Sequence, residues 1–167
     1  MAQILLYIGG ARSGKSRLAE ARTLALGQPA TYIATAEARD AEMADRIVAH
    51  QARRGPEWRT VSAPMDLHAA LCATDGSPRL IDCLTLWLTN LMLAERDWRH
   101  AAQDLLALVQ RQSAPVICVS NELGCGIVPD NPLARRFRDA QGWLNQTVAA
   151  AADEVHFVAA GLTLRMK

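Results

Sequence analysis

A glycine-rich stretch near the N-terminus constrains this chain more than any other feature. Residues 9–16 read GGARSGKS and fit G-x-x-x-x-G-K-[ST], the pattern of a phosphate-binding loop. An apolar run at residues 4–8 precedes it, and residues 17–26 follow with apolar side chains spaced as on one helix face. A strand, a glycine loop and a helix are the context that the pattern requires. We therefore predict that backbone amides at the start of this helix bind the phosphates of a nucleotide.

Two side chains of this loop and one acid further along the chain complete the expected site. Lys15 is placed to reach the β- and γ-phosphates of a nucleoside triphosphate, and the Ser16 hydroxyl is placed to hold Mg²⁺. Residues 80–82 read as a short strand that ends in Asp82, which is typical of the acid that helps to hold Mg²⁺ beside a phosphate loop. Ser16 and Asp82 are thus the predicted metal ligands, and Lys15 and Asp82 are predicted to act in catalysis.

Strands and helices alternate along the chain. Strands are predicted at residues 4–8, 30–35, 80–82, 115–119 and 155–159, with a short extended piece at 58–61. Helices are predicted at residues 17–26, 39–54, 65–73, 85–94, 99–111 and 132–152. This order favours an α/β fold with a mostly parallel, doubly wound sheet, and 167 residues suit a single domain over residues 1–167.

Composition excludes several classes of function. The formal net charge is +1, so no broad surface for nucleic acid or membrane is expected. No apolar run is long enough to span a bilayer, and the N-terminus lacks the pattern of a signal peptide. The four cysteines contain no C-x-x-C pair, which favours reduced thiols that bind no metal. We expect a cytoplasmic protein with no nucleic-acid partner and no membrane insertion.

His50 is the second candidate for chemistry. It lies in the predicted helix at 39–54, with Arg46 one turn before it and Arg53 and Arg54 one turn after. Nearby cations disfavour an imidazolium, and a neutral imidazole is a nucleophile. Attack on an α-phosphate would give a nucleotidyl-histidine and release pyrophosphate. The alternative is a structural or merely exposed histidine, which is how we interpret His68, His100 and His156.

Three functions are compatible with the phosphate loop itself. A bifunctional enzyme would use both the loop and His50. A plain kinase for a small alcohol would leave His50 without a role. A GTP-binding regulator is disfavoured, because N-K-x-D is absent and the only D-x-x-G, at residues 139–142, falls in a helical stretch.

The chain resembles the bifunctional adenosylcobinamide kinase / adenosylcobinamide-phosphate guanylyltransferase family of cobalamin biosynthesis. The matching stretches are GGARSGKS at 9–16, YIATA at 32–36, D-x-E-M-x-x-R-I-x-x-H at 40–50, W-R-T-V at 58–61, IDCLTLWLTNL at 81–91, V-S-N-E-L-G-x-G-I-V-P-D-N at 119–131, L-A-R-R-F-R-D at 133–139, L-N-Q at 144–146, A-A-D-E-V at 151–155 and A-G-L at 160–162. They cover nearly the whole chain in order.

This resemblance implies a RecA-like P-loop fold and a homotrimer with sites near subunit contacts. It implies that adenosylcobinamide is phosphorylated with ATP or GTP, and that GMP then passes from GTP to the new phosphate through a GMP-histidine at His50. The resemblance does not indicate where the corrinoid binds. Residues 84–93 are apolar enough to contact it, but we interpret them as core or subunit contact.

The resemblance also implies the residues that contact the nucleotide. They are Gly9, Gly10, Ala11, Arg12, Ser13, Gly14, Lys15, Ser16, Ala34, Thr35, Ala36, Gln51, Ala52, Arg53, Arg54, Ser62 and Asp82. Position 62 departs from the family pattern, which has an acid there. Ser62 can accept a hydrogen bond but carries no charge.

Overall fold

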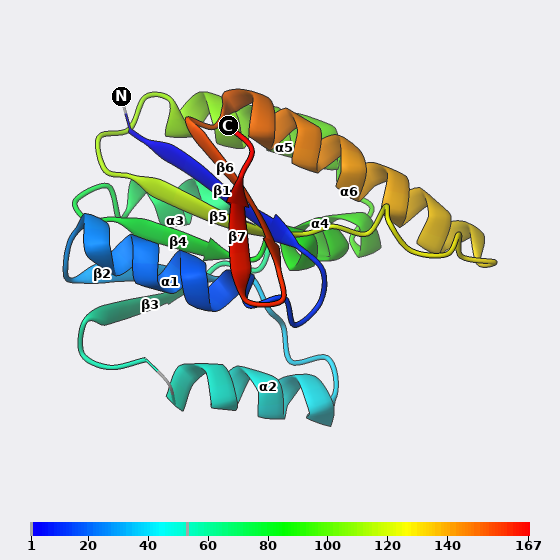
Figure 1. Ribbon diagram of the computed structural model, residues 1–167, viewed down its shortest axis with the longest axis horizontal. Coiled ribbons are helices and arrows are strands. Elements are labelled where there is room, and N and C mark those ends of the chain that lie inside the picture. The colour runs from blue at the N-terminus through cyan, green and yellow to red at the C-terminus, as the bar shows by residue number, and fades with distance from the viewer. Residues whose placement is uncertain (1, 53) are drawn as a thin grey trace.

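One sheet of mostly parallel strands forms the centre of the molecule (Figure 1). This computed structural model describes residues 2–52 and 54–167, together with the side chains of these residues except those of Glu42 and Arg46. The strands of the described part are β1 (Ile4–Gly9), β2 (Ala30–Ala34), β3 (Trp58–Ser62), β4 (Arg79–Asp82), β5 (Val116–Asn121), β6 (Glu154–Ala159) and β7 (Leu162–Arg165). Their order across the sheet is β3-β2-β4-β5-β1-β6-β7. All neighbours are parallel except β6 and β7, so the predicted sheet is confirmed.

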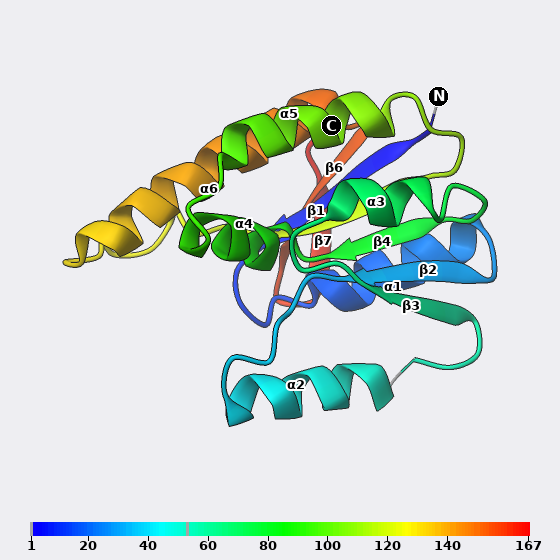
Figure 2. The ribbon, with the colours of Figure 1, turned by 180° about the vertical axis from the view of Figure 1, so that it is seen from behind.

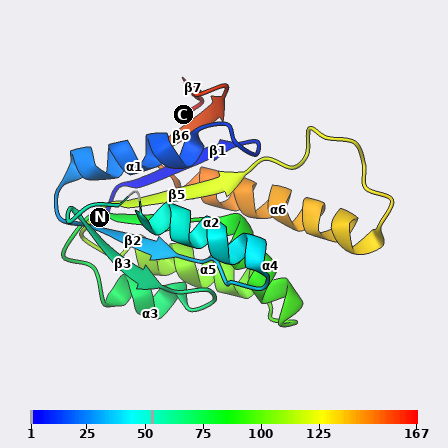
Figure 3. The same ribbon diagram turned by 90° about the horizontal axis from the view of Figure 1, so that it is seen from below.

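Helices cover both faces of the sheet, as Figure 3 shows from below. They are α1 (Lys15–Leu26), α2 (Ala41–Ala52), α3 (Leu67–Cys72), α4 (Leu84–Leu93), α5 (Trp98–Val109) and α6 (Pro132–Ala151). Leu5 and Tyr7 of β1 pack with Ala19 of α1 on one face, whereas Ile4 and Leu6 pack with α3 to α6 on the other. Strands buried on both faces are continuously apolar, which explains the runs seen in the sequence.

Helix α2 stands apart from the rest. It lies outside the edge strand β3 in Figures 1 and 2, rather than on either face of the sheet. Helix α2 connects β2 to β3, which are the two strands nearest this edge of the sheet. Residues of α2 and of the neighbouring strands β2 and β3 line one cavity, which is the candidate site.

Four differences from the predicted elements have local causes. The extended piece at 58–61 is the full strand β3, paired with β2 along its length. Helix α3 begins at Leu67 because Asp66 caps it, accepting the Ala69 N–H at 2.9 Å. Helix α2 begins at Ala41, two residues later than predicted. Strand β7 was not predicted; it returns antiparallel to β6 after a turn in which Ala160 and Gly161 have positive φ.

Two further predictions concern membranes and thiols. Of the helices that the structure describes, none combines the length and the apolar character needed to cross a membrane. All four cysteines are free; Cys83 and Cys118 are buried, and Cys72 and Cys125 are exposed.

Candidate functional site

The loop between β1 and α1 has the shape that a phosphate requires. A Cβ on Gly9 would lie 2.2 Å from the Val158 carbonyl oxygen, so only glycine fits at the end of β1. Gly14 adopts φ +95° as the N-cap of α1, and within the described residues no side chain caps the first amides of this helix. Uncapped amides at a helix N-terminus are a ready anion site.

Lys15 and Ser13 are buried inside this loop. The Lys15 ammonium donates to the Gly10 carbonyl at 3.0 Å, and 8% of the residue is exposed. Burial lowers the pKa of Lys15, while the neighbouring Cys83 and Asp82 act in the opposite direction. The Ser13 hydroxyl is also buried and has no hydrogen-bond partner in the described part of the chain. A buried donor of this kind is explained if a ligand oxygen completes its hydrogen bonding.

Ser16 and Asp82 meet at the base of the site. The Ser16 hydroxyl donates to one Asp82 carboxylate oxygen at 3.4 Å, and the Tyr32 hydroxyl donates to the other at 2.6 Å. A hydroxyl and a carboxylate are oxygen ligands of the kind that Mg²⁺ prefers, so this pair fits the ion that the phosphate loop implies. Burial, followed by the Asp82 charge and hydrogen bond, raises the pKa of Tyr32, which therefore stays a hydrogen-bond donor.

A cavity of about 340 Å³ opens between this pair and α2. It is lined by Ser16, Tyr32, Ala34, Ala36, Met43, Ile47, His50, Gln51, Arg54, Thr60, Ser62, Asp82, Cys83, Leu86 and Asn121. Ala34 and Ala36 after β2 thus face the same space as His50, Gln51 and Arg54. The lining combines aliphatic side chains with a few converging polar groups, which is the usual character of a small-molecule site.

The surroundings of His50 include carboxylates that the sequence did not predict. A His50 ring nitrogen, a Glu20 carboxylate oxygen and an Asp82 carboxylate oxygen lie within 4.8 Å of one another. Arg54 lines the same cavity, with its guanidinium carbon 3.8 Å from the centre of the Tyr32 ring. Two carboxylates thus lie beside the imidazole. Arg53 and the side chain of Arg46, the other predicted neighbours, lie outside the described residues.

Not every predicted contact faces the cavity. Thr35 is fully buried, and its hydroxyl accepts the Cys83 N–H and donates to the Cys83 carbonyl, both at 2.8 Å. It supports the chain beside Asp82 instead of lining the space. Ala52 is exposed on α2 and is not among the lining residues. Arg53, a predicted contact, lies outside the described residues.

Sequence reasoning missed several residues of this site. Tyr32 lies two residues before the predicted segment 34–36, and alternation along a strand places it on the same side as Ala34. Glu20 lies four residues after Ser16, so one helix face carries both. Either spacing could have identified them. Nothing in the sequence marked Met43 and Ile47 as site residues, because apolar residues on one face of a polar helix usually pack against the rest of the protein.

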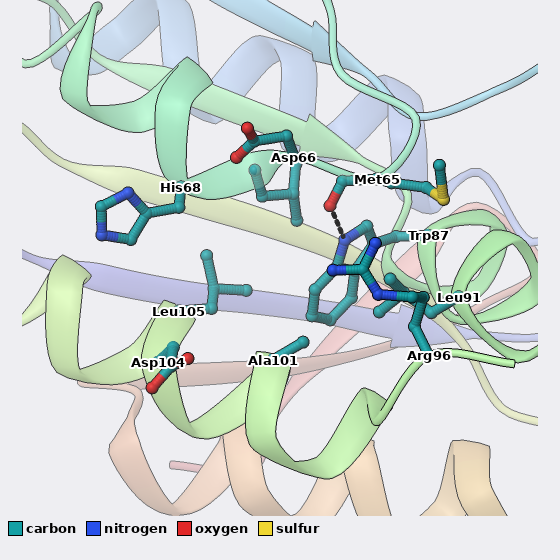
Figure 4. Close-up of a pocket in the computed structure, with 10 residues that line it drawn as sticks. Met65, Asp66, His68, Trp87, Leu91, Arg96, Ala101, Asp104 and Leu105 are labelled. Carbon is teal, nitrogen blue, oxygen red and sulfur yellow. Dashed lines mark hydrogen bonds between the residues drawn. The ribbon is translucent and has the colours of Figure 1, made fainter. Parts of the chain in front are cut away.

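A second cavity, of about 420 Å³, lies among α3, α4 and α5 (Figure 4). The Trp87 indole donates to the Met65 carbonyl at 2.8 Å at its wall, and Leu91 and Arg96 line it nearby. No residue of the phosphate loop is in its lining. Most of the apolar stretch 84–93 is core: Leu84, Trp87, Leu88 and Leu91 are buried.

The arginines early in α6 also have partners. Arg135 donates to the Pro129 carbonyl at 2.9 Å and to the Asp130 carbonyl at 2.6 Å. Arg138 donates to the carbonyls of Gly124 and Gly126. These bonds hold the loop before α6.

Comparison with known proteins gives a consistent result. The model of the cobinamide kinase / cobinamide phosphate guanyltransferase family matches residues 5–166. The chain is 46% identical to the bifunctional adenosylcobalamin biosynthesis protein CobP of Pseudomonas aeruginosa, covering 97% of this chain and 96% of that protein. It is 43% identical to the corresponding protein CobU of Salmonella typhimurium, covering 98% and 99%.

Among solved structures, the ATP synthase subunit NeqB of Nanoarcheaum equitans aligns with a TM-score of 0.52 and 12% identity. The match covers 95% of this chain and 45% of that one, so the chain spans less than half of that subunit. This likeness supports the P-loop fold and nothing more. The family match extends over almost the whole chain, and the relatives are similar over almost their whole length. The chain belongs to the cobinamide kinase / cobinamide phosphate guanyltransferase family.

Proposed function

We propose that this protein is a bifunctional enzyme of cobalamin biosynthesis. It phosphorylates adenosylcobinamide with ATP or GTP, and then transfers GMP from GTP to adenosylcobinamide phosphate. The observation that carries the proposal is the shared cavity: His50 on α2 faces the same space as Ser16 and Asp82, which close its base. A plain kinase needs only the latter pair, so it leaves the position of His50 unexplained.

The phosphate loop serves both reactions. In each, a triphosphate lies against the amides at the start of α1, and Lys15 places its ammonium on the outer phosphates. Ser16 and Asp82 would hold Mg²⁺, which neutralises charge that develops on the phosphate oxygens. The amides and Lys15 are oriented before the substrate arrives, so little reorganisation is needed during transfer.

The apolar walls suit the base of the nucleotide. Ala34, Ala36 and Ile47 provide aliphatic surface, and Gln51 and Ser62 provide polar atoms beside it. Ser62 stands where the family has an acid, so it can accept one hydrogen bond from guanine without adding charge. Base selectivity therefore depends more on neutral hydrogen bonds here than in relatives with the acid.

His50 supplies the nucleophile for the second reaction. A ring nitrogen attacks the α-phosphorus of GTP, a nitrogen–phosphorus bond forms, and pyrophosphate leaves. A phosphate oxygen of adenosylcobinamide phosphate then attacks the same phosphorus, and the nitrogen–phosphorus bond breaks. The ring recovers its electron pair, and adenosyl-GDP-cobinamide is released.

The protein is proposed to act as a homotrimer with corrinoid bound near subunit contacts. Support comes from large apolar side chains that are exposed on and after the loop before α6: Ile127 (97%), Val128 (63%), Leu133 (48%) and Trp143 (56%). Side chains of this kind in one region mark an interaction surface. Sedimentation equilibrium of the full chain gives the mass, and a monomer at micromolar concentration would contradict the trimer.

The test of the proposal is labelling with GTP that carries ³²P at the α-phosphate. Wild-type protein is expected to acquire label that is acid-labile and base-stable, as a phosphoramidate is, and to lose it when adenosylcobinamide phosphate is added. His50→Ala is expected to acquire no label while it retains measurable kinase activity. His100→Ala, at an exposed position on α5, is the control. Label on His50→Ala equal to the wild type would contradict the carrier role.

A further inference from the structure

Glu20 lies beside two residues of the active cavity, His50 and Asp82, although no sequence motif marks it. It lies on α1, one helical turn after Ser16, and its carboxylate approaches His50 and Asp82 to within 4.8 Å. Its negative charge also contributes to raising the pKa of Tyr32, after the larger effects of burial and Asp82. The Glu20 carboxylate therefore lies beside the imidazole and Asp82.

The two carboxylates near His50 are not equivalent. Both oxygens of Asp82 already accept hydrogen bonds, one from Ser16 at 3.4 Å and one from Tyr32 at 2.6 Å. Asp82 is also the acid expected to support the metal ion. Glu20 comes from a different element and stands outside the pair expected to support the metal ion, so orienting the imidazole does not compete with holding that ion. A carboxylate that accepts one ring N–H fixes both the tautomer and the orientation of a histidine.

We propose that Glu20 is the positioning residue of the carrier histidine, accepting the N–H of one His50 ring nitrogen so that the other nitrogen presents its electron pair to the α-phosphorus of GTP. This inference rests on the proposed function of His50. It assigns to α1 two tasks: its first amides bind the phosphates, and Glu20, one turn further along, orients the group that attacks them.

The chemistry of both steps requires no proton to move. When the nitrogen–phosphorus bond forms and pyrophosphate leaves, the ring keeps its second N–H and becomes cationic. The Glu20 carboxylate stabilises that positive charge, so it is expected to speed formation of the intermediate. When a phosphate oxygen of the corrinoid displaces the ring, the electron pair returns to nitrogen. Because Glu20 keeps the second N–H on the ring, the ring leaves as neutral imidazole and not as imidazolate.

Two variants test this role. Glu20→Ala removes the acceptor, and Glu20→Gln retains an acceptor without charge. Guanylyl transfer is expected to fall by at least about 10-fold in Glu20→Ala, with Glu20→Gln between it and the wild type, by analogy with losing the partner of a catalytic histidine. The kinase rate is expected to fall much less, so the ratio of the two rates changes. Glu95→Gln, at an exposed position after α4, is the control.

A spectroscopic measurement separates positioning from a purely structural role. In protein carrying ¹⁵N-labelled histidine, the His50 ring is expected to show one dominant tautomer in the wild type and a mixture in Glu20→Ala, with assignment from His50→Ala. An unchanged tautomer, or an equal loss of both activities, would overturn the inference. If His50→Ala still acquires label from GTP, the proposed function fails instead, whatever the Glu20 variants show.

Discussion

At the scale of single residues, the burial of Lys15 has a consequence for nucleotide binding. Burial lowers its pKa from the ordinary lysine value, so in the free protein its ammonium loses its proton at a lower pH than an exposed lysine does. Only the charged form binds the outer phosphates well. Affinity for a triphosphate is therefore expected to decline with rising pH before an ordinary lysine would titrate.

Measuring ATP affinity by calorimetry between about pH 7 and pH 10 checks this expectation, since adenine has no group that titrates there. Two neighbours do not interfere: burial raises the pKa of Cys83 to about 12, and the pKa of Tyr32 is raised as well. Lys15→Met should bind weakly at every pH and show no such decline. An affinity that is constant in the wild type to about pH 10 would contradict the role of burial.

At the scale of elements, a buried polar network joins α6 to the end of β5. The Asn145 carbonyl oxygen accepts from Ser120 at 2.6 Å and from Gln141 at 2.9 Å, and its amide donates to the Asn121 carbonyl at 3.0 Å. Asn121 lines the cavity, and its own N–H donates to Thr85 at 2.9 Å. The network therefore fixes the strand end that borders the site, from a helix that does not enter it.

Asn145→Ala is expected to lower the free energy of unfolding by about 1–3 kcal/mol, because it leaves buried polar groups without partners. It should also weaken nucleotide binding through movement of Asn121. Urea unfolding measures the first effect, with Gln146→Ala on the exposed side of the same helix as control, expected within about 0.5 kcal/mol of the wild type. Equal stability of the two variants would show that the network contributes little.

Most elements could be predicted because their signals are local. The phosphate loop, the strands buried on both faces and the capped helix α6 each carry a pattern within a dozen residues, and these predictions were confirmed in type. Strand β7 was missed because its exposed residues show no buried face, and its pairing with β6 follows only from the turn at Ala160 and Gly161.

The site was predictable only in part for a related reason. Motifs identified Ser16, Asp82 and His50, but whether their side chains meet depends on where α2 lies relative to β3, and no local pattern fixes that. Arginines near His50 in the sequence suggested a cationic environment. The structure also brings Glu20, from a different helix, beside His50, and a contact between two helices leaves no local pattern in the sequence.

At the scale of the whole molecule, the cavity and the buried Arg79 lie at opposite ends of the sheet. The cavity lies where the parallel strands end, at Ala34, Asp82 and Asn121. At the other end, the fully buried Arg79 begins β4, donating to the Leu71 carbonyl at 3.2 Å and to the Ala114 carbonyl. A substitution near Arg79 can therefore change the free energy of unfolding without changing the residues proposed to bind nucleotide.

Asp75 compensates the charge of the buried Arg79 by forming an ion pair with it. Its carboxylate lies 3.2 Å from the guanidinium and accepts the N–H groups of Ser113 and Ala114 at 3.0 Å. Burial alone would raise the pKa of Asp75, but these hydrogen bonds and the arginine charge outweigh it and lower the pKa below the usual 3.8. Because the folded-state pKa is depressed, the stabilisation is fully present above the unfolded value and is lost as the pH falls through the folded value.

Asp75→Asn is therefore expected to lower the free energy of unfolding at pH 7 by about 1–3 kcal/mol, since it leaves a buried guanidinium short of its charged partner. The difference from the wild type should begin to narrow as the pH falls below about 4, where the carboxylate of the unfolded chain becomes protonated, and should be lost as the pH falls through the lower pKa of the folded state. Urea unfolding across this range measures it, with Asp139→Asn at an exposed position of α6 as control. Both enzymatic rates should stay unchanged at pH 7. A constant difference down to the lowest pH at which both proteins fold would mean that Asp75 acts through shape and not through its charge.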